Sequence, residues 1–131
     1  MAVKPPKTRN SGQWTEARYR GFVRSALRAA WMRWGPNQET KKNARIARGV
    51  YMCAGYNTAP HEVGNSIKID GKRHNNIFTD HIVPVGTHID WNTTVERMFC
   101  EVEALQLLCK ECHDRKTKDE RAALKEAKEN L

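Results

Sequence analysis

Long apolar runs are absent from this sequence of 131 residues. No stretch approaches the roughly 20 apolar residues that a membrane-spanning helix needs, which argues against a membrane protein. Residues 1–12 also lack the apolar centre of a secretion signal. Without an export signal, the four cysteines are expected to meet a reducing cytosol, where thiolates bind metal more often than they form disulfides. We therefore expect a cytoplasmic protein.

Acidic residues are scarce in the first 48 positions. This part of the chain holds twelve Lys and Arg residues against only Glu16 and Glu39, whereas positions 49–131 hold eleven basic and thirteen acidic residues. The net charge of +8 is therefore a regional feature. A regional positive excess suggests a surface for a polyanion such as DNA, and the alternative is a solubilising arm.

The sequence divides by pattern into three parts, and it contains no internal repeat. Residues 1–12 combine two prolines with polar residues and are predicted to be a flexible basic arm. Residues 13–49 are predicted to be a basic region of two helices, and residues 50–131 mix short β-type runs with a charged C-terminal helix. We therefore expect an α+β fold, whose small core a structural metal would reinforce.

The basic helical region is predicted to have two different faces. Aromatic and apolar residues recur at three- and four-residue steps over positions 14–34, which indicates packing rather than a platform for stacked bases. Gly35-Pro36 ends this helix, and a second one is predicted over 37–48. On another face of the first helix, three arginines follow one another at four-residue steps and are predicted to bind DNA: Arg20, Arg24 and Arg28.

The C-terminal part alternates strands and turns before its last helix. Strands are predicted at 50–53, 66–69, 76–84 and 105–108, with a hairpin turn at Asp70-Gly71. A loop with a short helix is expected over 86–97. The final helix is predicted from about 110 to 130, where opposite charges recur at helical spacing.

Two segments of this part concentrate residues that bind metal ions or move protons. The first is D-H-I-V-P at 80–84, at the end of a predicted strand, and the second is L-C-K-E-C-H-D-R-K-T at 108–117, at the start of the last helix. An Asp-His pair is weak evidence by itself, and a single Cys-x-x-Cys indicates metal only moderately. In this order, and with a helix after the second segment, they form a strong signal.

With these segments the chain resembles the HNH nucleases, in their small phage-type branch, whose patterns are D-H-I-x-P and L-C-x-x-C-H-x-x-K-T. The resemblance covers roughly residues 51–121 and includes E-R-M-F-C at 96–100. It implies that residues 50–131 form an HNH nuclease domain with the ββα-metal fold, two strands and a helix around one catalytic divalent ion (Mg, Mn, Ni or Zn). It also implies a DNA endonuclease of phage origin in the host cytoplasm, with phage packaging or replication proteins as candidate partners.

The resemblance assigns Asp80 and His113 as ligands of the catalytic ion and His81 as the general base. The residue chemistry agrees, because imidazole, with an ordinary pKa near 6.5, accepts a proton from water, while carboxylate oxygen and imidazole nitrogen bind divalent ions. Neighbours on a strand point to opposite faces, so Asp80 and His81 cannot act identically. The alternative is that both histidines are ordinary core residues. Lys116 and Thr117 match the K-T of the pattern and are candidates for phosphate contact; otherwise Lys116 is a solvated helix charge.

The cysteines predict a second, structural metal. Cys109 and Cys112 precede the last helix as the second half of a zinc knuckle does, and the resemblance implies an earlier Cys-x-x-Cys. That position reads C-A-G-Y at 53–56, so one thiol is missing. Either His61 or Cys100 could complete the set. We favour zinc bound by Cys53, His61, Cys109 and Cys112; otherwise the thiols are small buried hydrophobes.

One position departs from the family pattern. The central Asn of the family, nine residues before the last His, is Ala104 here. That Asn is thought to brace the loop that carries the base or its water, and Asn92 is a candidate substitute. The departure leaves room for a rival, a non-catalytic zinc-ribbon module that binds nucleic acid with a degenerate HNH site. A nuclease acting on RNA is a further alternative.

Overall fold

A computed structural model describes residues 3–86 and 90–130, which form four α-helices and nine β-strands, an α+β protein as predicted. The chain divides into two compact units, Met1–Trp34 and Gly35–Leu131. The sequence pattern predicts this boundary after residue 49. It falls earlier because the second helix of the predicted pair packs on strands of the second unit.

The first unit is a short hairpin followed by a helix: β1 (Lys7–Arg9), β2 (Trp14–Thr15) and α1 (Glu16–Trp31). The helix begins where the Thr15 side chain accepts a hydrogen bond from the Arg18 amide at 3.2 Å. Arg9 forms an ion pair with Glu16 at 2.8 Å. Residues 7–9 of the predicted flexible arm form one strand of this hairpin; residues 1–2 lie outside the described part.

The aromatic residues of the first unit pack locally rather than in a deep core. The rings of Trp14 and Phe22 are 5.1 Å apart, and the guanidinium groups of Arg9 and Arg18 lie over Tyr19 and Trp14 at 4.2 and 4.7 Å. Phe22 is nevertheless 60% exposed. These contacts hold the hairpin against α1.

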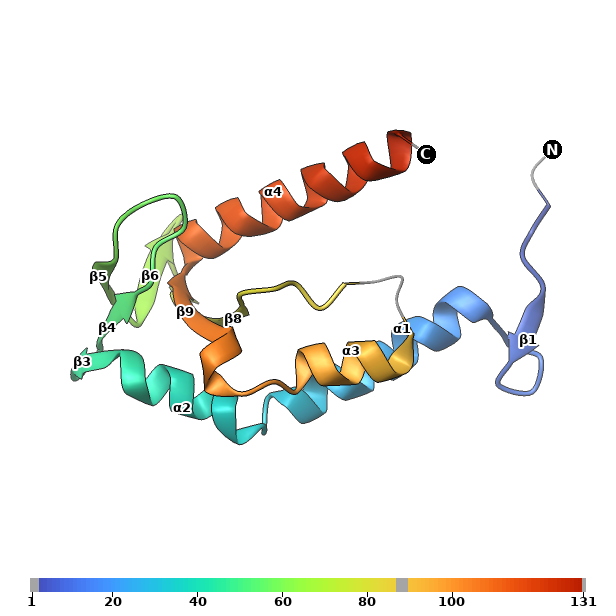
Figure 1. Cartoon of the computed structure of the whole chain (residues 1–131), viewed down its shortest axis with the longest axis horizontal. Coiled ribbons are helices and arrows are strands. Elements are labelled where there is room, and N and C mark those ends of the chain that lie inside the picture. The colour runs from blue at the N-terminus through green and yellow to red at the C-terminus, as the bar shows by residue number, and fades with distance from the viewer. Residues whose placement is uncertain (1–2, 87–89, 131) are drawn as a thin grey trace. The chain divides into compact units, whose positions relative to one another are not determined.

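The second unit begins with α2 (Gly35–Ala44), which ends four residues earlier than predicted. The chain turns at Gly49, with φ +75°, and pairs β3 (Arg45–Ala47) with β4 (Val50–Cys53). A positive φ is what glycine accommodates without strain. The remaining elements, shown in Figure 1, are β5 (His61–Gly64), β6 (Ser66–Ile69), β7 (Lys72–Asn75), β8 (Ile77–His81), α3 (Trp91–Met98), a 3-10 turn at Val102–Ala104, β9 (Leu105–Cys109) and α4 (Lys110–Glu129).

The antiparallel pair β8–β9 lies at the centre of the second unit, with Asp80 opposite Gln106 and His81 opposite Leu105. Helix α4 follows β9 directly and contacts one face of the pair (Figure 1), whereas α2 contacts the other, where Thr79 donates to the Asn37 carbonyl at 3.2 Å. The core is small and includes the fully buried Leu108. One face of the β8–β9 pair is therefore turned toward α4 and the other toward α2.

Two smaller sheets complete the unit. Strands β3, β4 and β5 form one, and its end joins β9 through a hydrogen bond from the Ala54 amide to the Leu107 carbonyl at 2.8 Å. Strands β6 and β7 form a separate hairpin. Among the described residues, no helix is both long and apolar enough to cross a membrane.

Candidate functional site

The four predicted zinc ligands lie together in the second unit. Their ligand atoms, three Sγ atoms and one imidazole nitrogen, are all within 4.8 Å of one another. Ligands around a tetrahedral Zn²⁺ with Zn–S bonds of about 2.3 Å are about 3.8 Å apart, so these atoms are spaced to share one ion. The Cys/His cluster, as we call it, could hold a metal ion such as zinc and consists of Cys53, His61, Cys109 and Cys112.

Four elements supply the Cys/His cluster. Cys53 ends β4 and pairs directly with His61, the first residue of β5. Cys109 ends β9, and Cys112 lies in the first turn of α4. A bound ion would therefore fasten the β4–β5 sheet to the junction of β9 and α4.

Hydrogen bonds orient His61 and Cys53 for a metal. His61 Nδ1 is 3.2 Å from the Ala59 carbonyl oxygen, and its Nε2 is 3.6 Å from Cys109 Sγ. A carbonyl oxygen only accepts, so Nδ1 carries the proton and Nε2 turns its lone pair toward the thiols. Cys53 Sγ accepts from the amides of Gly55 and Cys109 at 3.4 and 3.3 Å.

The thiols of the cluster differ in acidity. Burial raises the pKa of Cys53 to about 11. Burial also opposes ionisation of Cys112, but hydrogen bonds from Arg115, whose Nη2 is 3.3 Å from its Sγ, from the Tyr56 backbone and from the other two thiols lower its pKa to about 7. Cys112 is therefore more readily ionised than Cys53, and the thiolate is the form that binds a cation.

Tyr56 occupies the position of the missing cysteine. Its hydroxyl donates to Asp119 of α4 at 2.7 Å, and its side chain packs on the Cys/His cluster. The loop before it is tight: Gly55 has φ +83°, and a Cβ there would clash with the carbonyl oxygens of Thr58 and Ala59. Tyr56 therefore anchors the loop to α4, and His61 lies where a fourth ligand is needed.

Asp80 lies on the face of β8 that α4 covers. Its Oδ2 accepts from Gln106 Nε2 at 3.0 Å and is 2.9 Å from Lys116 Nζ. Lys116 also contacts Glu120 at 2.7 Å and donates to the His81 carbonyl at 2.8 Å. Burial would lower the pKa of Lys116, but the hydrogen bonds to Glu120 and Asp80 raise it, so the ammonium stays charged.

Lys116 therefore has neither of the roles considered from the sequence. Only 10% of its side chain is exposed, and its ammonium has three oxygen partners. A buried cation of this kind neither contacts phosphate nor stands solvated on a helix. In place of the predicted DNA contact, Lys116 neutralises Asp80 and Glu120 between β8 and α4.

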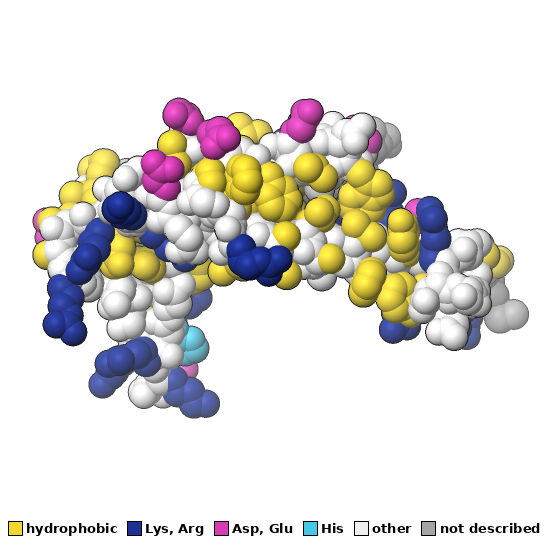
Figure 2. All heavy atoms as spheres, turned by 90° about the horizontal axis from the view of Figure 1, so that it is seen from below, with side chains coloured by type: hydrophobic (Ala, Val, Ile, Leu, Met, Phe, Trp, Pro, Cys, Tyr) yellow, Lys and Arg dark blue, Asp and Glu magenta, His cyan; other side chains and the backbone are white. Residues whose placement is uncertain are grey.

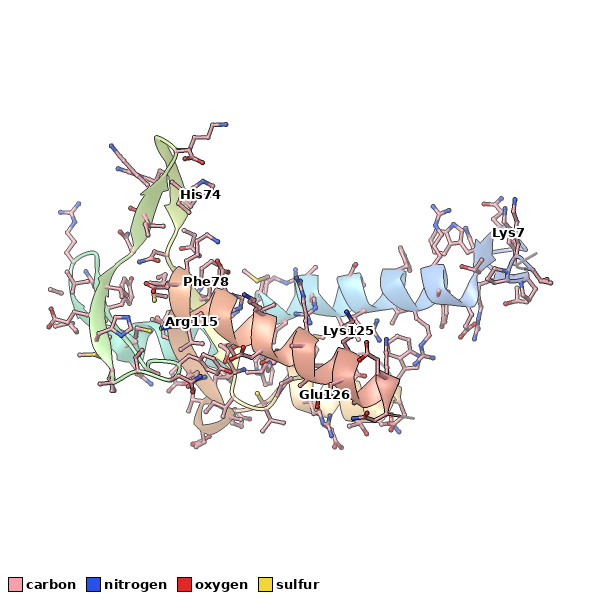
Figure 3. All side chains as sticks on the ribbon, turned by 90° about the horizontal axis from the view of Figure 1, so that it is seen from above. Lys7, His74, Phe78, Arg115, Lys125 and Glu126 are labelled. Atoms are coloured by element: carbon pink, nitrogen blue, oxygen red, sulfur yellow. The ribbon has the colours of Figure 1, made fainter. Side chains whose placement is uncertain are left out.

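His113 lies one turn before Lys116 on α4. Its ring stacks on Phe78, with centroids 4.8 Å and planes 16° apart; Figure 3 shows Phe78 of β8 beside the start of the helix. Phe78 and Asp80 are two residues apart and share a strand face, so α4 presents His113 toward the face that carries Asp80. A hollow beside His113 is lined by Asp114, Thr117, Lys118 and Arg121.

Within residues 3–86 and 90–130, the Cys/His cluster is the one group of three or more candidate ligands that can share an ion. Asp80 and His113 belong to no such group in this part of the chain.

A hydrogen bond holds the imidazole ring of His81, the last residue of β8. Its Nε2 is 2.9 Å from the Met98 carbonyl oxygen at the end of α3. Because this oxygen can only accept, Nε2 carries the proton and the lone pair is on Nδ1. The ring is half-buried, and this contact favours the tautomer with the proton on Nε2.

The backbone at Ala104 braces the segment after His81. The Ile82 amide donates to the Ala104 carbonyl at 3.0 Å and extends the β8–β9 pairing by one residue. Ala104 is exposed, and so is Asn92 in the first turn of α3. The sequence predicts a bracing side chain, whereas this contact is made by the backbone and is possible for any residue type.

The three predicted DNA-binding arginines lie on α1 of the first unit. Arg28 is exposed, whereas Arg20 and Arg24 are half-buried, and Arg20 is 3.9 Å from Glu16. They belong to a different compact unit from Asp80, His81 and His113.

Comparison of the chain with protein-family models, with curated proteins and with solved structures finds no match in any of the three.

Proposed function

We propose that this protein is a metal-dependent endonuclease of the HNH type that hydrolyses DNA phosphodiester bonds, with β8, β9 and α4 as a ββα-metal core. One observation carries the proposal: α4 holds His113 over the face of β8 that bears Asp80, and His81 follows Asp80 with its ring fixed by the Met98 carbonyl. These three side chains supply what phosphodiester hydrolysis needs.

His81 is the general base in this proposal. With its proton on Nε2, it takes a proton from water through Nδ1. The oxygen of that water attacks phosphorus, the bond from phosphorus to the 3′-oxygen breaks, and the 3′-oxygen takes up a proton. The products carry 5′-phosphate and 3′-hydroxyl ends. The hydrogen bond to Met98 keeps the base in one orientation, which lowers the entropic cost of reaching the transition state.

Asp80 and His113 fit a divalent ion by the chemistry of their donors, a carboxylate oxygen and an imidazole nitrogen. A bound ion supplies neutralisation of the charge that develops on the phosphate and the leaving oxygen. Lys116 and Gln106 both contact Oδ2 of Asp80, so they orient the carboxylate. Thr117, Lys118 and Arg121, beside His113, offer a hydroxyl and two cations to the phosphate backbone.

The test is incubation of the purified protein with supercoiled plasmid and Mg²⁺, Mn²⁺ or Ni²⁺. We expect nicked or linear plasmid only when one of these ions is present, and none after addition of a chelator. Single-stranded RNA serves as the second substrate. Failure to cut plasmid with every ion, by protein that is folded and metal-loaded at the Cys/His cluster, contradicts the proposal.

A second candidate is the non-catalytic zinc-ribbon module. The ion pair between Asp80 and Lys116 favours it, since the protein's own ammonium already neutralises this carboxylate. In that case the Cys/His cluster would serve only to build a surface that binds nucleic acid. The plasmid experiment separates the two, because the module binds DNA without cutting it.

Helix α1, which carries the three predicted arginines, is expected to increase the affinity for DNA without recognising its sequence. Replacing Arg20, Arg24 and Arg28 by Gln should weaken binding to all duplex sequences alike. Each phosphate contact contributes about 0.9 to the slope of log affinity against log salt, so the slope should fall by up to about 2.7. Fluorescence anisotropy over a salt series measures it, and an unchanged slope would show that these side chains do not contact DNA.

A further inference from the structure

The β6–β7 hairpin has no part in the nuclease site described above. It is a two-stranded antiparallel ribbon whose strands pair only with each other, joined by Asp70-Gly71 with φ +52° and +78°. Two positive φ values are typical of the tight turn whose twist matches that of the strands. Figure 3 shows the hairpin, with His74 on it, projecting from the rest of the second unit.

The hairpin is basic and exposed. It carries Lys68, Lys72 and Arg73 against one acidic residue, Asp70, and every residue of β7 is exposed. In the part of the chain that the structure describes, none of the three cations forms an ion pair, whereas Lys110 and Lys116 are both ion-paired. Figure 2 shows the projection with Lys and Arg side chains spread over it.

The register separates the two faces of the ribbon. Lys68 pairs with Arg73 and Ser66 with Asn75, so these four side chains share one face. Arg73 is of the type that makes paired hydrogen bonds to guanine. The Asn75 amide already donates to the Ile77 carbonyl at 2.6 Å and accepts from the Ile77 amide at 3.4 Å, so it contributes at most one further donor. The other face holds Ile67 with His74 and Ile69 with Lys72.

The base of the hairpin is fixed to the nuclease motifs. Asn76, which is buried, donates through Nδ2 to the Gly64 carbonyl at 3.0 Å and accepts at Oδ1 from the Lys110 amide at 3.1 Å. Its own amide donates to Asn65 at 3.1 Å. One side chain thus links the end of β5, the hairpin and the first residue of α4, so the ribbon has a set direction relative to β8.

We propose that the β6–β7 hairpin is a DNA-binding ribbon that enters the major groove of duplex DNA with the face formed by Ser66, Lys68, Arg73 and Asn75. The major groove admits a two-stranded ribbon, and phosphates line both of its edges. Lys68 and Arg73 lie on the entering face, and Lys72, on the other face, lies beside the turn. DNA as the duplex is taken from the proposed function; the surface itself rests on the charge and shape of the hairpin.

The covalent chain limits how far from the cut the hairpin binds. Arg73 and Asp80 are seven residues apart in nearly continuous strand, which spans at most about 23 Å at about 3.3 Å per residue. Base pairs are spaced by about 3.4 Å, so hairpin contacts are expected within about seven base pairs of the scissile phosphate.

Binding is measured on the full chain carrying His81→Gln, so that cutting does not interfere. One variant adds Lys68→Gln, Lys72→Gln and Arg73→Gln, and a matched control adds Lys42→Gln, Lys125→Gln and Lys128→Gln, three exposed cations outside the hairpin. We expect the hairpin variant to lose at least tenfold in affinity and up to about 2.7 in salt slope, and the control to lose much less. Both should unfold at the temperature of the parent.

The groove is identified with modified DNA. Glucosylated cytosines, which fill the major groove, should reduce parental affinity to that of the hairpin variant, and a minor-groove ligand should not. Equal DNA affinities of the hairpin variant and the control variant overturn the proposal. So does an unchanged affinity of the parent for glucosylated DNA. The proposal also fails if the hairpin substitutions weaken binding to single-stranded DNA as much as binding to duplex DNA. If the parent never cuts plasmid but binds through the hairpin, the nuclease proposal fails and this one stands.

Discussion

Replacing His81 by Gln is expected to lower the rate of metal-dependent plasmid cleavage by about 10²- to 10⁴-fold, the usual contribution of a general base. The imidazole ring is held through Nε2 by the Met98 carbonyl, which puts the lone pair on Nδ1. A glutamine amide can donate the same hydrogen bond from its nitrogen, but it does not accept a proton from water near neutral pH. The substitution therefore removes the base and keeps the contact.

His81→Ala is the matched variant, since it removes the base and the contact together. Loss of one hydrogen bond costs about 1 kcal/mol of unfolding free energy, so His81→Ala should be less stable than His81→Gln by about that amount. Both should be equally inactive and should bind plasmid as the parent does. Denaturant unfolding and single-turnover cleavage measure the two effects separately.

A cleavage rate of His81→Gln close to that of the parent would remove His81 from the chemistry. The Met98 contact would then be purely structural, and the alanine variant alone would lose activity through loss of stability. Equal loss in both variants with unequal stability supports the base.

Local sequence signals predicted the four helices and four of the nine strands of the described part. The runs at 50–53 and 66–69 are strands with the predicted bounds, and Asp70-Gly71 forms the predicted turn. Helix α4 begins at Lys110 as predicted. These elements are short-range structures, in which turn residues and the period of apolar side chains are sufficient. The expected short helix corresponds to α3, although residues 87–89 of that segment lie outside the described part.

Long-range contacts could not be predicted in the same way. His61 was favoured as the fourth member of the Cys/His cluster because a missing thiol needs a replacement nearby, and the structure confirms its proximity. The ion pair of Lys116 with Asp80 depends on how α4 packs on β8, over a separation of 36 residues. No spacing rule connects two such positions, so the sequence does not reveal that Lys116 is buried.

The second unit is expected to contain about one tightly bound zinc per chain and to unfold when that metal is removed. Zinc binding in small structural sites is worth about 10–16 kcal/mol, comparable with or larger than the total stability of about 5–15 kcal/mol of a domain. Because the Cys/His cluster fastens β4, β5, β9 and α4, its loss should affect the whole unit. Elemental analysis, and circular dichroism during titration with a strong chelator, measure the two effects.

Cys112→Ser and Cys100→Ser form a matched pair for this prediction. Both exchange a thiol for a hydroxyl, but Cys112 belongs to the Cys/His cluster and Cys100 does not. We expect Cys112→Ser to lose the zinc and to be largely unfolded, and Cys100→Ser to keep both its zinc and most of its stability. His61→Cys should retain the metal, since three cysteines and a histidine or four cysteines both enclose Zn²⁺.

The same measurements also show whether the cysteines stabilise the fold when no metal is bound. Burial keeps Cys53 protonated, with a pKa of about 11, so binding of zinc must displace its proton. Zinc affinity should therefore weaken as the pH falls, because protons compete for the ligands. Protein purified in zinc-containing medium that holds no metal, and that tolerates Cys112→Ser as well as Cys100→Ser, would show that the thiols act as packing residues. The anchoring of Tyr56 to Asp119 would then hold the loop without an ion.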